Sequence, residues 1–348
     1  DWEQSVGNGS DDYFSKLMPA VAYGKVFASD REGEVSAFDI ETGKQQWQVT
    51  LSEDSSFFSS TASAQLSGGI STGYDKIVIG AESGMLFVLN QSDGSIHWKK
   101  QVDGEILSRP LLAMNKVITV MGNGKVIAFD LESGEESWVF QQDVPALTLR
   151  GTSGIVENQG AAFFGLSNGK IAGVLIEDGR AIWEAVVTTS RGGNELSGII
   201  DIDSTPLILG GTMYAIGYNG NLVAIETRSG KVLWKRDYSS FQALAINGFN
   251  LFLTTDEGHV YAIDRRSGLE IWSQMGLENR SLTAPAVIGN SVAVVDFEGY
   301  LHLLSQETGE FVGQQEIDDD GHIATPLSVD GRLYLQSKDG LLSALSIK

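Results

Sequence analysis

The residues that could do chemistry are few and widely separated along this chain. Its four histidines, His97, His259, His302 and His322, show no metal-ligand spacing such as two histidines four residues apart on a helix. We therefore expect them to be strand residues at the surface rather than metal ligands. Cysteine is absent, which excludes disulfide frameworks, cysteine-based zinc sites and cysteine nucleophiles.

Acidic residues gather in two places. The run from Glu316 to Gly321 has three consecutive aspartates, but it lacks the spaced ligands and the final bidentate glutamate of an EF-hand loop. We interpret it as a solvated turn. Asp201 and Asp203 form a second group just before Ser-Thr-Pro. No motif combines a nucleophile, a base and an orienting group, so we expect no catalytic residue, no metal site and no bound cofactor.

The charge balance excludes further classes of protein. The 348 residues include 24 basic and 45 acidic side chains, and the net charge is −21. Such a chain repels a phosphate backbone unless it carries a local basic patch, and the sequence has none. No apolar stretch reaches the roughly 18 residues of a membrane-spanning helix. The start, Asp1-Trp2-Glu3, is not a signal peptide.

The elements that would position these residues form a repeat. A glycine that opens a short apolar strand recurs every 38 to 51 residues, and in seven copies a second glycine follows ten residues later. A tryptophan follows after four more residues in six of these copies, whereas the seventh has Gly313 there. The opening glycines are Gly33, Gly84, Gly124, Gly169, Gly220, Gly258, Gly299 and Gly340.

Proline supplies an independent register. Five of the six prolines lie 14 residues before an opening glycine: Pro19, Pro110, Pro206, Pro285 and Pro326. Because proline is tolerated at a strand start but not inside a sheet, each of them is expected to open the first strand of a repeat. We expect the tryptophans to pack between neighbouring sheets rather than to form a ligand cage.

A repeat of about 40 residues with four short strands is typical of a propeller blade. The eighth copy ends before its tryptophan-bearing strand, and the unmatched Trp2 lies at the other end of the chain. We therefore expect an all-β, eight-bladed β-propeller of four-stranded antiparallel blades, in which residues 1–7 complete the last blade and remove the free edges. The predicted blades of this single 1–348 domain are 17–51, 66–102, 107–142, 152–187, 203–238, 241–276, 282–316, and 323–348 with 1–7.

Two repeats are longer than the others. The additional residues lie between Ser52 and Gly69 and between Glu184 and Ile200. Insertions in propellers often lie on a binding face, although simple elongated loops explain them almost as well.

The blade pattern resembles the quinoprotein-type propeller repeat. Over its whole length the chain resembles the BamB family, the β-propeller lipoproteins of the bacterial outer-membrane β-barrel assembly machinery. The most specific segments are residues 143–151 (DVPALTLRG), 201–206 (DIDSTP), 217–222 (GYNGNL) and 105–110 (EILSRP). The segment at 143–151 is more specific to this family than the repeats, because many propellers share the repeats.

This resemblance implies a non-enzymatic scaffold. The family is lipid-anchored through an N-terminal cysteine on the periplasmic face of the outer membrane, and that cysteine would lie upstream of residue 1. Its partner is the periplasmic POTRA region of BamA, and through BamA the other assembly components. The resemblance also implies contact with unfolded outer-membrane protein clients. The family's contact residues match Leu147, Leu149, Arg150, Asp201 and Asp203.

The repeat register gives independent support for part of this set. Arg150 and Asp201 each lie 19 residues before an opening glycine, so they occupy equivalent positions in connections between adjacent blades. We expect Arg150 and the two aspartates to form a charged network beside exposed leucines, which suits a binding hot spot. In the alternative, the leucines pack under the connection and Arg150 only neutralises Asp201.

Two other functions remain open at this stage. One is a quinone-dependent dehydrogenase built on the same repeat, which the absence of cysteine and the short chain disfavour. The other is a ligand-binding or sensor propeller.

Overall fold

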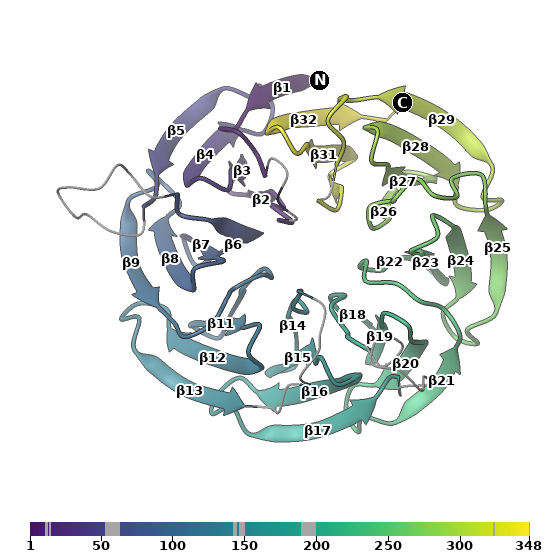
Figure 1. Cartoon of the computed structure of the whole chain (residues 1–348), viewed down its shortest axis with the longest axis horizontal. Helices are drawn as coiled ribbons and strands as arrows, with labels where there is room; N and C mark the ends of the chain where they lie inside the picture. The colour runs from purple at the N-terminus through teal and green to yellow at the C-terminus, as the bar shows by residue number, and fades with distance from the viewer. Residues whose placement is uncertain are drawn as a thin grey trace.

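The structure, a computed structural model, describes residues 1–10, 13, 15–52, 63–141, 145, 150–188, 200–322 and 324–347. The regular secondary structure of these residues consists of strands, grouped in eight four-stranded antiparallel sheets. Figure 1 shows the sheets arranged as blades around a ring. The predicted eight-bladed propeller is confirmed.

Blades one to seven each contain four consecutive strands, which follow one another from the centre of the ring outwards. Blades one to four are β2 (Ala20–Ala22), β3 (Lys25–Ser29), β4 (Glu34–Asp39), β5 (Gln45–Thr50); β6 (Leu66–Gly73), β7 (Lys76–Ala81), β8 (Met85–Asn90), β9 (Ile96–Gln101); β10 (Leu111–Ala113), β11 (Lys116–Val120), β12 (Lys125–Asp130), β13 (Glu136–Gln141); and β14 (Val156–Asn158), β15 (Ala161–Gly165), β16 (Lys170–Leu175), β17 (Ala181–Val186).

The other half of the ring repeats this order. Blades five to seven are β18 (Leu207–Leu209), β19 (Thr212–Ile216), β20 (Leu222–Glu226), β21 (Val232–Arg236); β22 (Ala245–Asn247), β23 (Asn250–Thr254), β24 (Val260–Asp264), β25 (Glu270–Gln274); and β26 (Ala286–Ile288), β27 (Ser291–Val295), β28 (Tyr300–Ser305), β29 (Phe311–Glu316). Blade eight is β30 (Leu327–Val329), β31 (Arg332–Gln336), β32 (Leu341–Ser346) and β1 (Trp2–Ser5).

The first strand of the chain closes the ring. Strand β1 pairs with β32, with Trp2 opposite Ala344 and Ser5 opposite Leu341. In Figure 1 the two termini lie close together at the junction of blades eight and one. The expected strand starts are confirmed as well, because each of the five prolines directly precedes the first strand of a blade.

The tryptophans join neighbouring blades. Every one of the seven donates a hydrogen bond from its indole nitrogen to a backbone carbonyl of the following blade, at 2.7 to 3.1 Å. The donor and acceptor pairs are Trp2–Ile40, Trp47–Gln91, Trp98–Leu131, Trp138–Ile176, Trp183–Thr227, Trp234–Arg265 and Trp272–Gln306. The expectation that they pack between sheets is confirmed.

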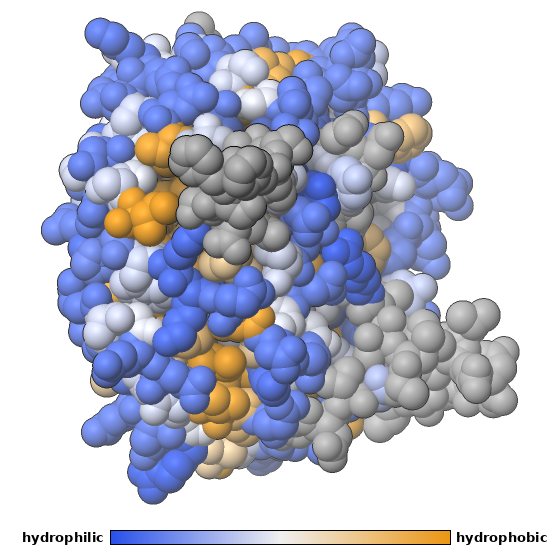
Figure 2. Space-filling model, turned by 60° about the vertical axis from the view of Figure 1, so that its left-hand side comes forward, coloured by the Kyte–Doolittle hydropathy of each residue, from blue (hydrophilic) through white to orange (hydrophobic). Residues whose placement is uncertain are grey.

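The second glycine of each repeat makes room for the indole. At Gly179, for example, φ is +72° and an added Cβ would lie 2.6 Å from the Trp138 ring. The buried apolar clusters accordingly lie between adjacent blades, as in the cluster of blades one and two that holds Phe27 and Leu89. The part of the molecule in Figure 2 is mainly hydrophilic, with separate small apolar groups.

No helix in the described residues is long and apolar enough to cross a membrane.

Candidate functional site

Blade topology gathers two kinds of loop on one face of the ring. In an antiparallel blade, the turn between the second and third strands lies at the same end as the connection that enters from the preceding blade. We call this end the connection face. Arg150 lies in the connection between β13 and β14, and Asp201 and Asp203 lie in the connection between β17 and β18. The structure therefore places these three residues on the connection face, in adjacent connections.

Arg150 forms two ion pairs on this face. Its Nη2 lies 2.9 Å from Glu82 Oε2 and 3.0 Å from Glu105 Oε1. Glu82 comes from the turn between β7 and β8, and Glu105 from the connection between blades two and three. The hydrogen bonds to Glu105 and Glu82 raise the pKa of Arg150, so the guanidinium stays charged. The Arg150 side chain is still 52% exposed and available to a partner.

A second arginine shares one of these carboxylates. Arg31, in the turn between β3 and β4, donates to Glu82 through Nε at 3.2 Å and Nη2 at 3.0 Å. Burial favours the neutral form of Glu82, but the hydrogen bonds from Arg31 and Arg150 outweigh it and lower the pKa of this carboxyl. The Arg31 guanidinium also lies 3.6 Å from the centre of the Tyr13 ring. Blades one to three are thereby tied by alternating charges, which we call the Arg31–Glu82–Arg150–Glu105 chain.

The two aspartates lie deeper than Arg150. The Asp201 side chain is buried, and its backbone carbonyl accepts a hydrogen bond from the amide of Tyr218 at 2.9 Å. Asp203 packs against the residue after Arg150, since a Cβ added to Gly151 would lie 2.5 Å from Asp203 Oδ2. Burial and the neighbouring Asp201 raise the pKa of Asp203 to about 7, against an opposing effect of Lys16.

The predicted site is therefore brought together only in part. Arg150 and Asp203 are neighbours, but the expected pairing of Arg150 with the aspartates is wrong, because its ion pairs go to Glu82 and Glu105. Leu147 and Leu149 lie outside the described residues, as do 53–62 and 189–199, which make up most of the two predicted insertions.

Sequence reasoning missed Arg31, Glu82 and Glu105 as members of this site. Glu105 belongs to one of the segments that carry the family resemblance. Arg31 and Glu82 each lie two residues before an opening glycine. That shared position, at the tip of a turn on the connection face, is the signal that could have found them.

Two histidines also differ from the expectation. His302 and His322 are buried, with 3% and 4% exposure, rather than at the surface. Nε2 of His302 lies 2.7 Å from Asp296 Oδ2, so its polar group is satisfied inside the blade. His97 does lie on an outer strand, 3.1 Å from the carbonyl of Glu132.

Two other chemical motifs have known places in the fold. The carboxylates of Asp318, Asp319 and Asp320 lie within 4.8 Å of one another between β29 and β30, close enough to share a metal ion, so the interpretation of this segment as a solvated turn stays a prediction. A Gly-x-Ser-x-Gly run at residues 69–73 lies in β6, where Ser71 donates to the carbonyl of Pro110. A nucleophile elbow instead needs a sharp turn from a strand to a helix.

Comparison with known proteins identifies the family. The family model described as "Outer membrane protein assembly factor BamB" matches residues 2–71 and 31–274. A relative of that name from Shewanella oneidensis is 42% identical over 348 residues, covering 99% of this chain and 88% of the relative. The chain belongs to the BamB family. The resemblance in the sequence is thereby confirmed, and its members are named outer membrane protein assembly factors.

Solved structures agree on the fold. The crystal structure of BamB from Moraxella catarrhalis superposes with a TM-score of 0.87 at 24% identity, and covers 99% of this chain and 100% of its own. Quinohemoprotein alcohol dehydrogenase from Comamonas testosteroni matches with a TM-score of 0.76 at 16% identity, over 97% of this chain and 72% of its own. The likeness to the dehydrogenase is one of fold alone.

Proposed function

We propose that this chain is a non-enzymatic scaffold that docks onto the POTRA region of BamA and assists the folding and insertion of outer-membrane β-barrels. Membership of the BamB family carries this proposal, since 42% identity extends over the whole propeller. We further propose that the full protein is held at the periplasmic face of the outer membrane by a lipidated N-terminal cysteine. The net charge of −21 disfavours direct adhesion to anionic lipid, so attachment needs such an anchor.

The docking surface in this proposal is the connection face of blades three to five. The residues proposed to contact the partner are Arg150, Asp203, Leu147 and Leu149. The Asp201 side chain is buried, so its proposed part is to position the adjacent connection. Arg150 supports the assignment because its charged head is half exposed yet held by two carboxylates. A preorganised arginine loses less side-chain entropy when a partner binds than a mobile one. An arginine beside apolar anchors is also typical of a binding hot spot.

Calorimetric titration with the POTRA region of the cognate BamA tests the docking. We expect Arg150→Ala to weaken binding by about 2 kcal/mol or more, as for truncation of one partner of a hydrogen-bonded charge pair. Arg180→Ala is the matched control. Arg180 pairs with Asp178 and is 75% exposed, but it lies in the turn between β16 and β17, at the opposite face.

The outcomes test the identity of the partner and the location of the binding site separately. Loss of binding in Arg150→Ala with normal binding in Arg180→Ala supports both the partner and the site. If the Arg150→Ala variant binds the POTRA region as tightly as the wild type, the scaffold proposal stands and the binding site lies elsewhere on the propeller. Absence of wild-type binding would overturn the docking proposal, and the quinone-dependent dehydrogenase would then be tested by spectral titration with quinone and calcium.

A further inference from the structure

Glu82 is the most buried member of the Arg31–Glu82–Arg150–Glu105 chain. Its side chain is 7% exposed, against 11% for Arg31, 43% for Glu105 and 52% for Arg150. Its Oε1 accepts a hydrogen bond from Arg31 Nε, and its Oε2 accepts from Nη2 of both arginines. Glu82 therefore links a nearly buried arginine of blade one to the exposed arginine of the proposed docking surface.

Backbone hydrogen bonds hold Glu82 and Arg31 in place. The amide of Glu82 donates to the carbonyl of Gln65 at 2.8 Å, and the carbonyl of Arg31 accepts from the amide of Leu66 at 2.9 Å. Gln65 and Leu66 are neighbours at the start of β6, so both members of the ion pair are fixed to the same short stretch of blade two. The two parallel hydrogen bonds from Arg31 then set the orientation of the Glu82 carboxylate.

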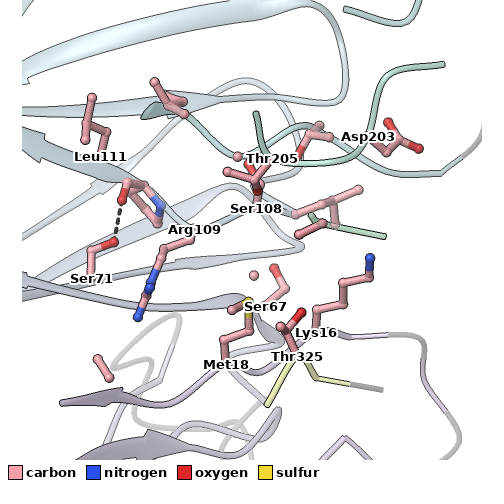
Figure 3. A pocket seen from close by; sticks show the side chains of 18 of the residues that line it. Lys16, Met18, Ser67, Ser71, Ser108, Arg109, Leu111, Asp203, Thr205 and Thr325 are labelled. Carbon is pink, nitrogen blue, oxygen red and sulfur yellow. Dashed lines mark hydrogen bonds between the residues drawn. The ribbon is translucent and has the colours of Figure 1, made fainter. Parts of the chain in front are cut away.

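Arg150 has open space on one side. It borders the central cavity, which has a volume of about 730 Å³ and whose wall also contains Asp203 and Thr205 of the connection between β17 and β18. Figure 3 shows this cavity with Asp203 and Thr205 labelled. Because packing restrains a side chain little beside open space, the ion pairs with Glu82 and Glu105 determine where the guanidinium lies. Both are made by Nη2, which leaves Nε and Nη1 without a hydrogen bond to the part of the chain that the structure describes.

The two carboxylates do not restrain Arg150 equally. Glu105 is much more exposed than Glu82, and an ion pair between exposed side chains contributes little, because water screens it and both side chains lose freedom. The pair with the buried Glu82 is screened less. Without the charge of Glu82, Arg150 would also lie near the Arg31 guanidinium with no anion between them, and the two cations would repel each other.

We propose that Glu82 is the positioning residue of the docking surface, and that its carboxylate holds the Arg150 guanidinium in place for the partner without contacting the partner itself. This inference rests on the proposed docking through Arg150, and it adds a residue of blade two to a surface of blades three to five. Glu82 acts by reducing the side-chain entropy that Arg150 loses on binding. For one long side chain this loss corresponds to about two- to tenfold in affinity.

Glu82→Gln tests the proposal, because it keeps the size of the side chain and removes its charge. In calorimetric titration with the POTRA region of the cognate BamA, we expect it to weaken binding about fivefold. In the Arg150→Ala background the same change should alter the affinity by less than about twofold, since the arginine that Glu82 positions is gone. A merely structural effect of Glu82 on the connection face would weaken binding by the same factor in both backgrounds.

Glu298→Gln is the matched control. Glu298 lies in the equivalent turn of blade seven, between β27 and β28, and its carboxylate pairs with Arg280 at 2.5 Å. Figure 1 shows this blade on the other side of the ring from blade three. Removal of its charge should leave the affinity for the POTRA region unchanged.

Nitrogen-15 relaxation of the Arg150 Nε–H group measures the positioning without any partner. We expect the order parameter of this group to fall in Glu82→Gln and to stay unchanged in Glu298→Gln. An unchanged order parameter in Glu82→Gln, or an equal loss of affinity in both backgrounds, would overturn the positioning role and leave docking through Arg150 intact. If Arg150→Ala itself binds as the wild type does, the proposed docking site fails, and the role of Glu82 fails with it.

Discussion

Asp296 illustrates how single residues stabilise the blades. Its buried carboxylate, after β27, accepts a hydrogen bond from Arg280 Nε at 2.5 Å and lies 2.7 Å from His302 Nε2. The backbone amides of Glu298 and Tyr300 donate to its other oxygen, both at 3.0 Å. Burial alone would raise the pKa of Asp296, but the contacts with His302 and Arg280 outweigh it and lower the pKa to about 2.

This shift predicts a pH-dependent contribution to stability. Because the folded-state pKa lies below the unfolded value of about 4, the contribution is complete well above pH 4 and is lost as the pH falls through 2. We expect Asp296→Asn to lower the free energy of unfolding by about 2 to 3 kcal/mol at pH 7, and by about half as much at pH 3. Urea unfolding at both pH values measures the difference.

Asp330→Asn is the control, because Asp330 lies exposed in the turn between β30 and β31 and should leave the unfolding curve unchanged. An equal loss for Asp296→Asn at pH 7 and pH 3 would show that the loss does not come from the charge.

At the scale of elements, each blade depends on the fit between a tryptophan and the glycine of the next blade. The structure explains the one repeat that breaks this pattern. Blade seven has Gly313 instead of tryptophan, and Gly313 pairs with Leu303, which is larger than the alanine, glycine or valine found opposite the tryptophans in the other blades. In blade eight the fourth strand is β1, which no turn joins to β32, so this blade has no second glycine that would need an indole from blade seven.

This fit predicts that the second glycines tolerate alanine less well than ordinary turn glycines. Gly179→Ala puts a methyl group 2.6 Å from the Trp138 ring at a positive φ of +72°. Gly289→Ala has a comparable φ of +53°, but its methyl group meets nothing within 4 Å. Both changes incur about 1 kcal/mol of backbone strain, and Gly179→Ala should lose about 1 to 3 kcal/mol more from overpacking. Urea unfolding of the two variants measures the difference, and equal losses would refute the fit.

The sequence predicted the strands and blades better than it predicted which side chains contact one another. Glycine, proline and tryptophan each have a backbone or packing requirement at a fixed place in the blade, so their spacing revealed all eight blades. The partners of Arg150 were not predictable in this way. Glu82 lies 68 residues away on another blade, and only the three-dimensional arrangement of the loops brings it to Arg150.

The whole molecule depends on closure of the ring by one four-residue strand. Besides pairing with β32, strand β1 supplies Trp2, whose ring lies 6.3 Å from Phe38 of blade one and 6.2 Å from Tyr334 of blade eight. The same side chain therefore contributes to blade eight and to its junction with blade one. The strands of the other tryptophans are joined by a turn to the third strand of their own blade, whereas β1, which carries Trp2, is joined to β32 only by non-covalent pairing.

Trp2→Ala and Trp98→Ala should therefore differ in which strands become accessible to solvent. Trp98 makes the same type of contacts, a hydrogen bond to Leu131 at 2.7 Å and a ring contact with Phe129 at 6.2 Å, but its strand β9 is joined by a turn to β8 of the same blade. Both changes should lower the free energy of unfolding by about 3 kcal/mol or more. Hydrogen exchange separates them: Trp2→Ala should expose the amides of β1 and β32 through local opening of the ring, whereas Trp98→Ala should leave those strands protected. Unchanged exchange in β1 and β32 of Trp2→Ala would mean that backbone pairing alone closes the propeller.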